Sequence, residues 1–359
     1  MEYPVCQLLN SRIIIIGGMA LAHLFVFHFA IAGGLYLGPA ESFARRRNDP
    51  AHLAHLRGQS RFYLLMTILF GAAIGTGICV TTRLLLPDGI PWLSRDFHLV
   101  WATVSVLFAV EFTAILLYYF GWTRLSPRRH LIIGWINLAA ALLSLAAING
   151  ILGFLLAPVT WPETGNFWAG FFNPNFWPSL IFRIFACLAL AGLCATFTAA
   201  REKNEAFKVR LLRRNGLLVL ASIALAVPAA YWSIKALPPQ VAAGFVPGTD
   251  AYTPLQVAML TAAVLALLTL LGTIIFPRHW GYVSAGILLL CGLLSLGAFE
   301  WMRESHFGFM TFPEAADLAA SRQWSPLAVF VGTFVIGLIV IVWMLRIFMV
   351  KSNTDRQQS

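Results

Sequence analysis

The sequence predicts an all-α polytopic membrane protein of about nine transmembrane helices, with its N-terminus outside the cytoplasm and its C-terminus inside. Three observations predict this class. The 359 residues are 59% hydrophobic and 11% charged, whereas a soluble domain carries roughly 25% charged residues. Apolar stretches of about 20 residues, the length that crosses the hydrocarbon core of a bilayer, recur along the chain. Basic residues gather in alternate connections between these stretches, which is the pattern of the positive-inside rule.

The apolar stretches must cross the membrane as helices, because lipid offers no partner for an unpaired backbone N–H or C=O group. The first stretch lacks a basic leader and a small-residue cleavage site, so we expect a retained span rather than a signal peptide. The expected spans are 13–37, 62–85, 97–120, 131–156, 177–199, 215–235, 254–276, 280–300 and 326–349.

Basic residues decide the expected orientation, since connections rich in Lys and Arg stay on the cytoplasmic side. They follow the first, third, fifth, seventh and ninth spans. We therefore interpret the net charge of +10 as a consequence of topology and not as a sign of nucleic-acid binding. The residues are Arg45, Arg46, Arg47, Arg57, Arg61, Arg124, Arg128, Arg129, Arg201, Lys203, Lys208, Arg210, Arg213, Arg214, Arg278, Arg346, Lys351 and Arg356.

The connections are too short to fold separately, so residues 1–350 are predicted to form one transmembrane domain. Residues 351–359 are predicted to form a disordered cytoplasmic tail. The five cysteines form no CxxC or CxxCH pattern, and the sequence therefore signals neither a zinc site nor a covalent c-type heme. We expect these cysteines to be small packing residues.

Ionisable side chains inside a span cost about 3 kcal/mol or more and are therefore functional candidates. His23 lies about ten residues into the first span, at a depth of roughly 15 Å, where an imidazole could ligate a heme iron or bond to a neighbouring helix. His28 is turned roughly 140° away from His23 on the same helix. The two cannot face one iron, so His28 is expected to be a packing or second-site residue.

Acidic and basic candidates occur in three further spans. Glu111 lies midway along the third, where burial favours a protonated carboxyl or a hydrogen-bonded partner. It is either a proton carrier or a neutral acid joining two helices. Glu300 ends the eighth span, where an interfacial salt bridge is the alternative to a functional role. Arg183 lies near the outer end of the fifth span and is expected to snorkel outward.

Five local motifs occur in order along the expected spans. They are A-H-L-F-V-F at Ala22 to Phe27, E-F-T-A-I-L-L-Y-Y-F-G-W-T-R-L at Glu111 to Leu125, N-G at Asn149 and Gly150, F-N-P at Phe172 to Pro174, and F-E-W at Phe299 to Trp301. The most specific is the Glu followed nine residues later by F-G-W-x-R-L. In their order and helix placement these motifs resemble subunit I of the cytochrome bd quinol oxidases, and the resemblance covers the first five spans well and the last four weakly.

That family has nine helices with the same orientation, and the resemblance implies noncovalent heme in a bacterial or archaeal plasma membrane. His23 and Glu300 match the family's ligands to iron near the outer face. Glu111 matches the second acidic residue of the third helix and is implied to be the catalytic proton carrier. Asn149, in the N-G motif, and Met259, which matches a methionine ligand of the low-spin heme, complete the implied cofactor-binding set. A high-spin b-type heme is implied, and a d-type identity for the other outer heme stays open.

Several departures separate this chain from the family. Arg183, nine residues before Gly192, replaces the histidine that holds the low-spin heme, and an arginine cannot serve as that ligand. Thr103 replaces the first acidic residue of the third helix. The quinol-binding outer loop shrinks to a short stretch within 235–254, and no G-R-Q-P-W motif follows Glu300. These departures argue against a low-spin b heme and against quinol as the direct electron donor.

We therefore expect a divergent bd-oxidase-like subunit I, a heme-bearing membrane electron-transfer protein with O2 as its candidate acceptor. A second membrane subunit and a c-type cytochrome donor are the expected partners. Two other functions remain open: a heme-free structural subunit that pairs with a catalytic bd-like subunit, and a proton-coupled transporter that uses Glu111. Whether the chain itself is catalytic is left open by the sequence.

Overall fold

The computed structural model describes residues 3–85, 97–156, 166–249, 252–307 and 324–349. Within these ranges the chain forms nine long helices and no strand, which confirms the predicted all-α class. The predicted tail 351–359 lies outside the described residues. The helices are α1 (Tyr3–Arg46), α2 (Pro50–Leu85), α4 (His98–Gly121), α5 (Pro127–Leu156), α8 (Phe176–Ala199), α9 (Glu205–Lys235), α11 (Tyr252–Thr269), α12 (Tyr282–Phe307) and α13 (Trp324–Met349).

The length and apolarity of the helices fit a membrane protein. In the described ranges, seven of them are long and apolar enough to cross a bilayer. The other two, α2 and α12, have 36 and 26 residues. A π-helical turn, η2 (Leu270–Ile275), extends α11. The prediction of a multi-pass membrane protein is therefore confirmed.

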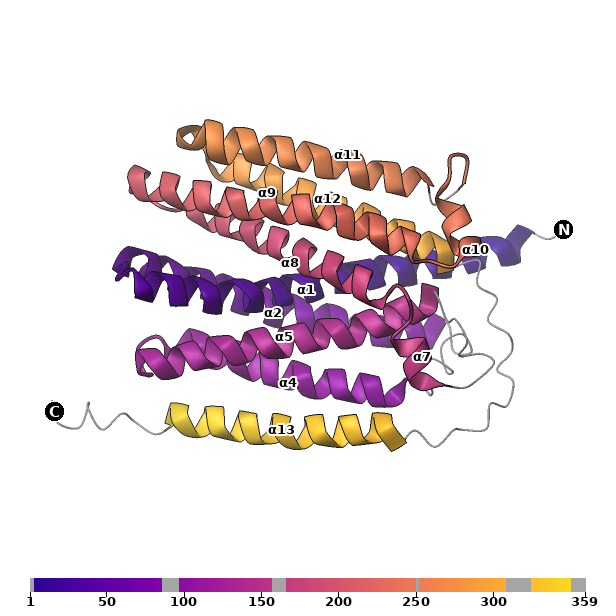
Figure 1. Cartoon of the computed structure of the whole chain (residues 1–359), viewed down its shortest axis with the longest axis horizontal. Coiled ribbons are helices and arrows are strands. Elements are labelled where there is room, and N and C mark those ends of the chain that lie inside the picture. The colour runs from indigo at the N-terminus through magenta and orange to yellow at the C-terminus, as the bar shows by residue number, and fades with distance from the viewer. Residues whose placement is uncertain (1–2, 86–96, 157–165, 250–251, 308–323, 350–359) are drawn as a thin grey trace.

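The helices run back and forth along one axis, so that the connections gather at two ends (Figure 1). The basic connections between α1 and α2, α4 and α5, α8 and α9, and α11 and α12 lie at the same end, the left end of Figure 1. The described part of α1 begins at the opposite end. This agrees with the predicted alternation of the loops, and the cytoplasmic location of the basic end stays a prediction.

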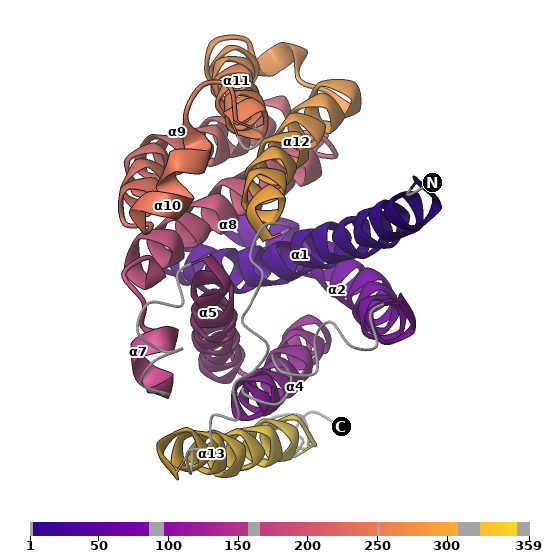
Figure 2. The same cartoon turned by 90° about the vertical axis from the view of Figure 1, so that its right-hand side faces the viewer.

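Helix α1 runs through the middle of the bundle and contacts α2, α5, α8 and α12 (Figure 2). On one side of α1 and α8 lie α9, α11 and α12, and on the other lie α4, α5 and α13. Small residues let α1 approach its neighbours closely, as is common between membrane helices. A methyl group on Gly38 would lie 3.1 Å from the backbone of Gly134 in α5. The backbones of α1 and α5 therefore meet directly, one turn before Glu41.

Short helical elements lie at the end opposite the basic connections. Helix α7 (Phe167–Phe171) precedes α8, and α10 (Pro239–Ala242) with the 3-10 turn η1 (Ala243–Phe245) follows α9. Helix α9 ends at Lys235 and α11 begins at Tyr252. The connection between α9 and α11 is therefore short, as the sequence predicted for the stretch within 235–254.

Candidate functional site

His23 is a half-buried side chain of α1, and in the described part of the chain its Nδ1 is buried without a hydrogen-bond partner. Glycine on α2 leaves space beside the ring, since a methyl group on Gly75 would lie 3.5 Å from Cε1 of His23. Buried polar atoms are nearly always satisfied in folded proteins. An orphaned imidazole nitrogen inside a membrane helix is therefore a feature that a bound group would explain.

Glu300 lies in α12, and its side chain is outside the described residues. Its helix packs against α1, on the face that carries Phe25. Gly297, three residues earlier, packs on Phe25, where a methyl group on the glycine would lie 3.1 Å from Cζ of the ring. Phe25 follows His23 by two residues, a rotation of about 200° around α1, and the ring of His23 lies against Gly75 of α2 instead. The structure thus brings together the helices that carry the two residues expected to bind iron.

Glu111 is buried in α4 and accepts a hydrogen bond from the hydroxyl of Ser144 in α5. The expectation of a hydrogen-bonded partner is met by this contact. Since Ser144 donates to Oε1, Glu111 has one defined contact across the α4–α5 interface. The carboxyl remains in an apolar region, and the contact is compatible with either role that the sequence leaves open.

Asn149 and Met259 lie in different surroundings. Asn149 is fully buried, its amide N–H donates to the carbonyl of Phe176 at 2.8 Å, and its carbonyl accepts from Ser179 Oγ at 3.0 Å. Both ends of this side chain therefore join α5 to α8. Met259 is 66% exposed on α11. Its cofactor-binding role stays a prediction, and the structure does not bring it into the interior of the bundle.

Arg183 corrects one expectation, because it is buried and does not snorkel outward. The side chain is 3% exposed, and its Nη1 lies 3.2 Å from Nε2 of His28. Nδ1 of His28 lies 2.8 Å from the carbonyl oxygen of Leu24, which can only accept, so Nδ1 donates and Nε2 accepts from Arg183. The histidine on α1 thus supplies an acceptor that makes burial of this guanidinium tolerable.

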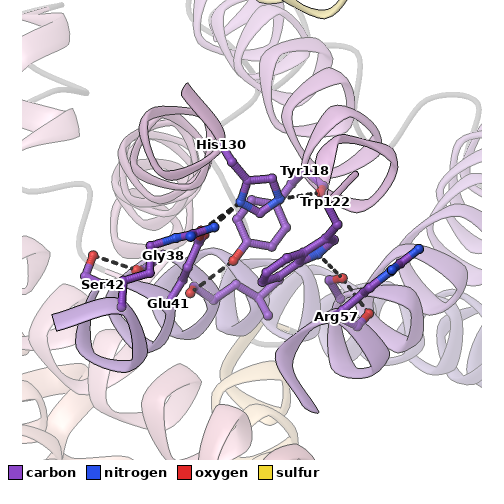
Figure 3. A network of polar contacts seen from close by, with 10 residues as sticks. Gly38, Glu41, Ser42, Arg57, Tyr118, Trp122 and His130 are labelled. Atoms are coloured by element: carbon purple, nitrogen blue, oxygen red, sulfur yellow. Dashed lines mark hydrogen bonds and ion pairs between the residues drawn. The ribbon is translucent and has the colours of Figure 1, made fainter. Parts of the chain in front are cut away.

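A second buried polar group, which the sequence reasoning missed, lies near the basic end of the bundle (Figure 3). Glu41 is fully buried, both its oxygens lie 2.9 Å from Nδ1 of His130, and Nε of Arg45 donates to Oε1 at 2.6 Å. Nε2 of His130 donates to the carbonyl of Tyr118 at 2.8 Å. Since that carbonyl only accepts, Nε2 carries a hydrogen, and Nδ1 faces the two carboxyl oxygens of Glu41.

Aromatic rings enclose the contact between Glu41 and His130. The rings of Tyr118 and Trp122 each lie with centroids 4.3 Å from that of His130. Trp122 Nε1 donates to Ser60 Oγ at 3.1 Å, which ties α4 to α2. One sequence signal could have found Glu41: it follows His23 by 18 residues, which is five full turns, so both lie on one face of α1.

Removing the carboxyl of Glu41 should destabilise the protein strongly. Glu41→Ala leaves His130 and Arg45 without their buried acceptor, a type of change that costs about 3–5 kcal/mol. We expect a large fall in the thermal unfolding temperature in detergent. Glu205→Ala is the matched control, because Glu205 is exposed and pairs with Lys208 at 3.1 Å, a kind of pair worth at most about 1 kcal/mol. Equal losses in the two variants would contradict a structural role for Glu41.

Comparison with known proteins places this arrangement in a known fold. The structure of bd oxidase from Geobacillus thermodenitrificans matches with a TM-score of 0.70, over 94% of this chain and 98% of that chain, at 13% sequence identity. The chain has a bd-oxidase-like fold. No family model and no curated protein sequence matches the chain. The structural comparison therefore shows the fold alone, because the sequence identity is low. The activity has to be argued from the residues of this chain.

Heme is the cofactor expected from the sequence resemblance, and the residues at His23 fit such a group. The imidazole has a buried nitrogen with no protein partner, and α2 presents Gly75 beside its ring. Neutral imidazole is a common axial ligand of heme iron. The donor at this position is therefore chemically suitable.

The residues around Arg183 do not fit a low-spin heme. A guanidinium is no iron ligand, this one is bound to His28, and the cavity that it lines between α5, α8 and α9 measures about 30 Å³. That volume holds about one or two water molecules. Met259, the expected opposite ligand, is largely exposed on α11.

Proposed function

We propose that this chain is a divergent bd-oxidase-like subunit that binds noncovalent heme and transfers electrons in the membrane, with O2 as the acceptor. The observation that carries this proposal is the buried, unpartnered Nδ1 of His23 in a bd-like fold. Membrane helices rarely retain such a group without a use for it. The proposal places the protein in a bacterial or archaeal plasma membrane, next to a second membrane subunit.

The residues have distinct proposed roles. His23 and Glu300 would hold the heme iron near the end of the bundle opposite the basic connections. When bound, the heme would supply the electron transfer and the O2 chemistry. Glu111 would release and take up protons, while Ser144 holds its carboxyl in one orientation. Burial in an apolar span suits Glu111 to this task, because a carboxyl there can exist in its neutral form.

A reduced minus oxidised absorption spectrum of the purified protein, combined with analysis of extracted heme, tests the proposal. We expect noncovalent heme in protein expressed with its partners in a heme-replete host. The same data decide between b-type and d-type heme. A complete lack of heme under these conditions would reject the proposal in favour of a structural subunit.

The electron donor is proposed to be a c-type cytochrome that docks at the outer end of the bundle. By the sequence resemblance, Arg183 stands where the family has its low-spin heme histidine, the α9–α11 connection is short, and the sequence has no CxxCH motif. An electron therefore needs a donor on another polypeptide. We expect the native complex to consume O2 with a reduced c-type cytochrome, and the isolated chain to consume little with quinol. Fast quinol oxidation by the isolated chain, with a low-spin b signal, would contradict this.

A heme-free structural subunit is the second candidate function. The observation that favours it is the environment of Arg183, where an arginine and a histidine occupy the interior expected for a heme. If the same conversion extended to His23, the chain would retain only the fold and would pair with a catalytic bd-like subunit. The unpartnered nitrogen of His23 favours the heme-bearing function instead.

A further inference from the structure

A basic pocket of about 480 Å³ opens between the end of α1, the start of α2 and the first half of α9. Its most informative lining residues are Phe43, Arg47, Asp49, His52, Arg210 and Arg214. These lie at the end of the bundle that carries the basic connections. None of the residues proposed to bind heme or carry protons contributes to this pocket.

The charges of this basic pocket are not balanced within the described residues. Arg210 Nη2 pairs with Asp49 Oδ2 at 3.2 Å, and Asp49 is the one carboxylate in its lining. Three arginines less one aspartate leave two positive charges. Such an excess of positive charge in a concave site between helices attracts anions.

The two remaining arginines, Arg47 and Arg214, pack on an aromatic ring and keep N–H donors available for a ligand. The guanidinium carbons of Arg47 and Arg214 lie 4.5 Å and 3.9 Å from the centroid of the Phe43 ring. Contact with an aromatic ring occupies the face of a guanidinium and leaves N–H donors along its edge. Those donors match the oxygens of a phosphate group, which arginine binds in a two-pronged manner.

His52 supplies a second, independent sign of a ligand. Its side chain is 2% exposed, and its Nδ1 lies 3.3 Å from Nη1 of Arg214, which can only donate, so Nδ1 accepts. Nε2 then carries the hydrogen, and it is buried without a partner. An unmet buried donor is costly. His52 lines the basic pocket, and its Nε2 is a donor that no described residue satisfies.

The pKa of His52 is lowered by burial and, to a smaller extent, by the positive charges of the basic pocket. This residue precedes the expected second span, which begins at 62. Burial, the largest cause, lowers its pKa to about 4, and the charge of Arg214 lowers it further. His55 and Arg210 also lower the pKa, whereas Asp49 raises it by less than these two together lower it. His52 is therefore neutral at pH 7, and the tautomer that donates from Nε2 is the one present.

We propose that the basic pocket binds a phosphate group, carried by the headgroup of an anionic phospholipid. Basic pockets between transmembrane helices on the cytoplasmic side are known to bind such headgroups. Phe43, in the lining, is 37% exposed, so part of its apolar ring is free to contact acyl chains. A lipid source is favoured over a soluble one because the pocket lies where α1 leaves the membrane, at the interface occupied by headgroups.

Lipid binding by the purified native complex tests this proposal. Delipidated protein is titrated with phosphatidylglycerol, phosphatidylcholine or inorganic phosphate, and bound lipid is measured by native mass spectrometry. We expect phosphatidylglycerol to bind and phosphatidylcholine to bind much more weakly. Arg47→Gln/Arg214→Gln should weaken phosphatidylglycerol binding by about 25-fold, at about fivefold for each basic residue near the membrane surface.

Arg46→Gln/Arg213→Gln is the matched control, because it removes the same charge from the exposed residues that directly precede Arg47 and Arg214 in the chain and do not line the pocket. It should change the affinity less than about threefold. Equal weakening in both double variants would show a diffuse surface effect and overturn the proposal. Phosphatidylcholine binding as tightly as phosphatidylglycerol would overturn it as well. If inorganic phosphate binds the wild type and phosphatidylglycerol does not, the lipid assignment is wrong.

Discussion

Replacing His23 by alanine is expected to remove at least one heme from the purified protein. The imidazole is the donor that α1 presents at this depth, and its Nδ1 has no protein partner among the described residues. Losing an axial ligand of a noncovalent heme removes the strongest bond that holds it. Heme extracted and quantified per mole of protein should fall by one equivalent or more, and the variant should keep its helical content because it loses no protein hydrogen bond at Nδ1.

His28→Ala is the matched control for this prediction. It removes an imidazole from the same helix, five residues away, but the ring of His28 lies against Arg183 and away from His23. Its heme content should stay near that of the wild type, although its stability should fall. Normal heme content in His23→Ala would remove His23 from the ligand set. Equal loss of heme in both variants would point to general damage of the bundle.

The spans were predictable from sequence because apolar windows of membrane length are conspicuous. The ends of the helices were less predictable. The first span was expected at 13–37, whereas α1 runs from Tyr3 to Arg46 and includes Pro39 and the polar residues around Glu41. Helical hydrogen bonds continue into the flanks, where tertiary contacts such as the Gly38–Gly134 approach stabilise a turn that composition alone would not assign to a span.

The candidate site was predictable only where one residue stands out in its own segment. His23 and Glu111 are ionisable groups within apolar runs, so their positions carry a signal. The roles of Ser144 and His130 become visible only once the structure shows their partners on other helices. Ser144 bonds to Glu111, and His130 bonds to Glu41. Such pairings depend on helix rotation and packing, which hydropathy does not encode. Burial of Arg183 was missed for the same reason.

Replacing Glu111 by glutamine is expected to slow proton-coupled turnover about 100-fold or more, while the heme content stays near that of the wild type. A positioned group that exchanges protons contributes about 100- to 10,000-fold to a rate, and glutamine cannot titrate. The amide carbonyl can still accept the hydrogen bond that Ser144 donates, so the local structure should persist. Turnover is measured as O2 consumption by the native complex, with proton uptake followed by a pH-sensitive dye.

Ser144→Ala separates the chemistry of Glu111 from its position. The carboxyl keeps its ability to titrate but loses the hydroxyl that orients it, so turnover should fall less than in Glu111→Gln. Full proton-coupled turnover in Glu111→Gln would exclude Glu111 from the mechanism. A loss of heme in that variant would assign Glu111 to the binding shell instead. The order wild type, Ser144→Ala, Glu111→Gln is expected because a misoriented carboxyl still exchanges protons and an amide does not.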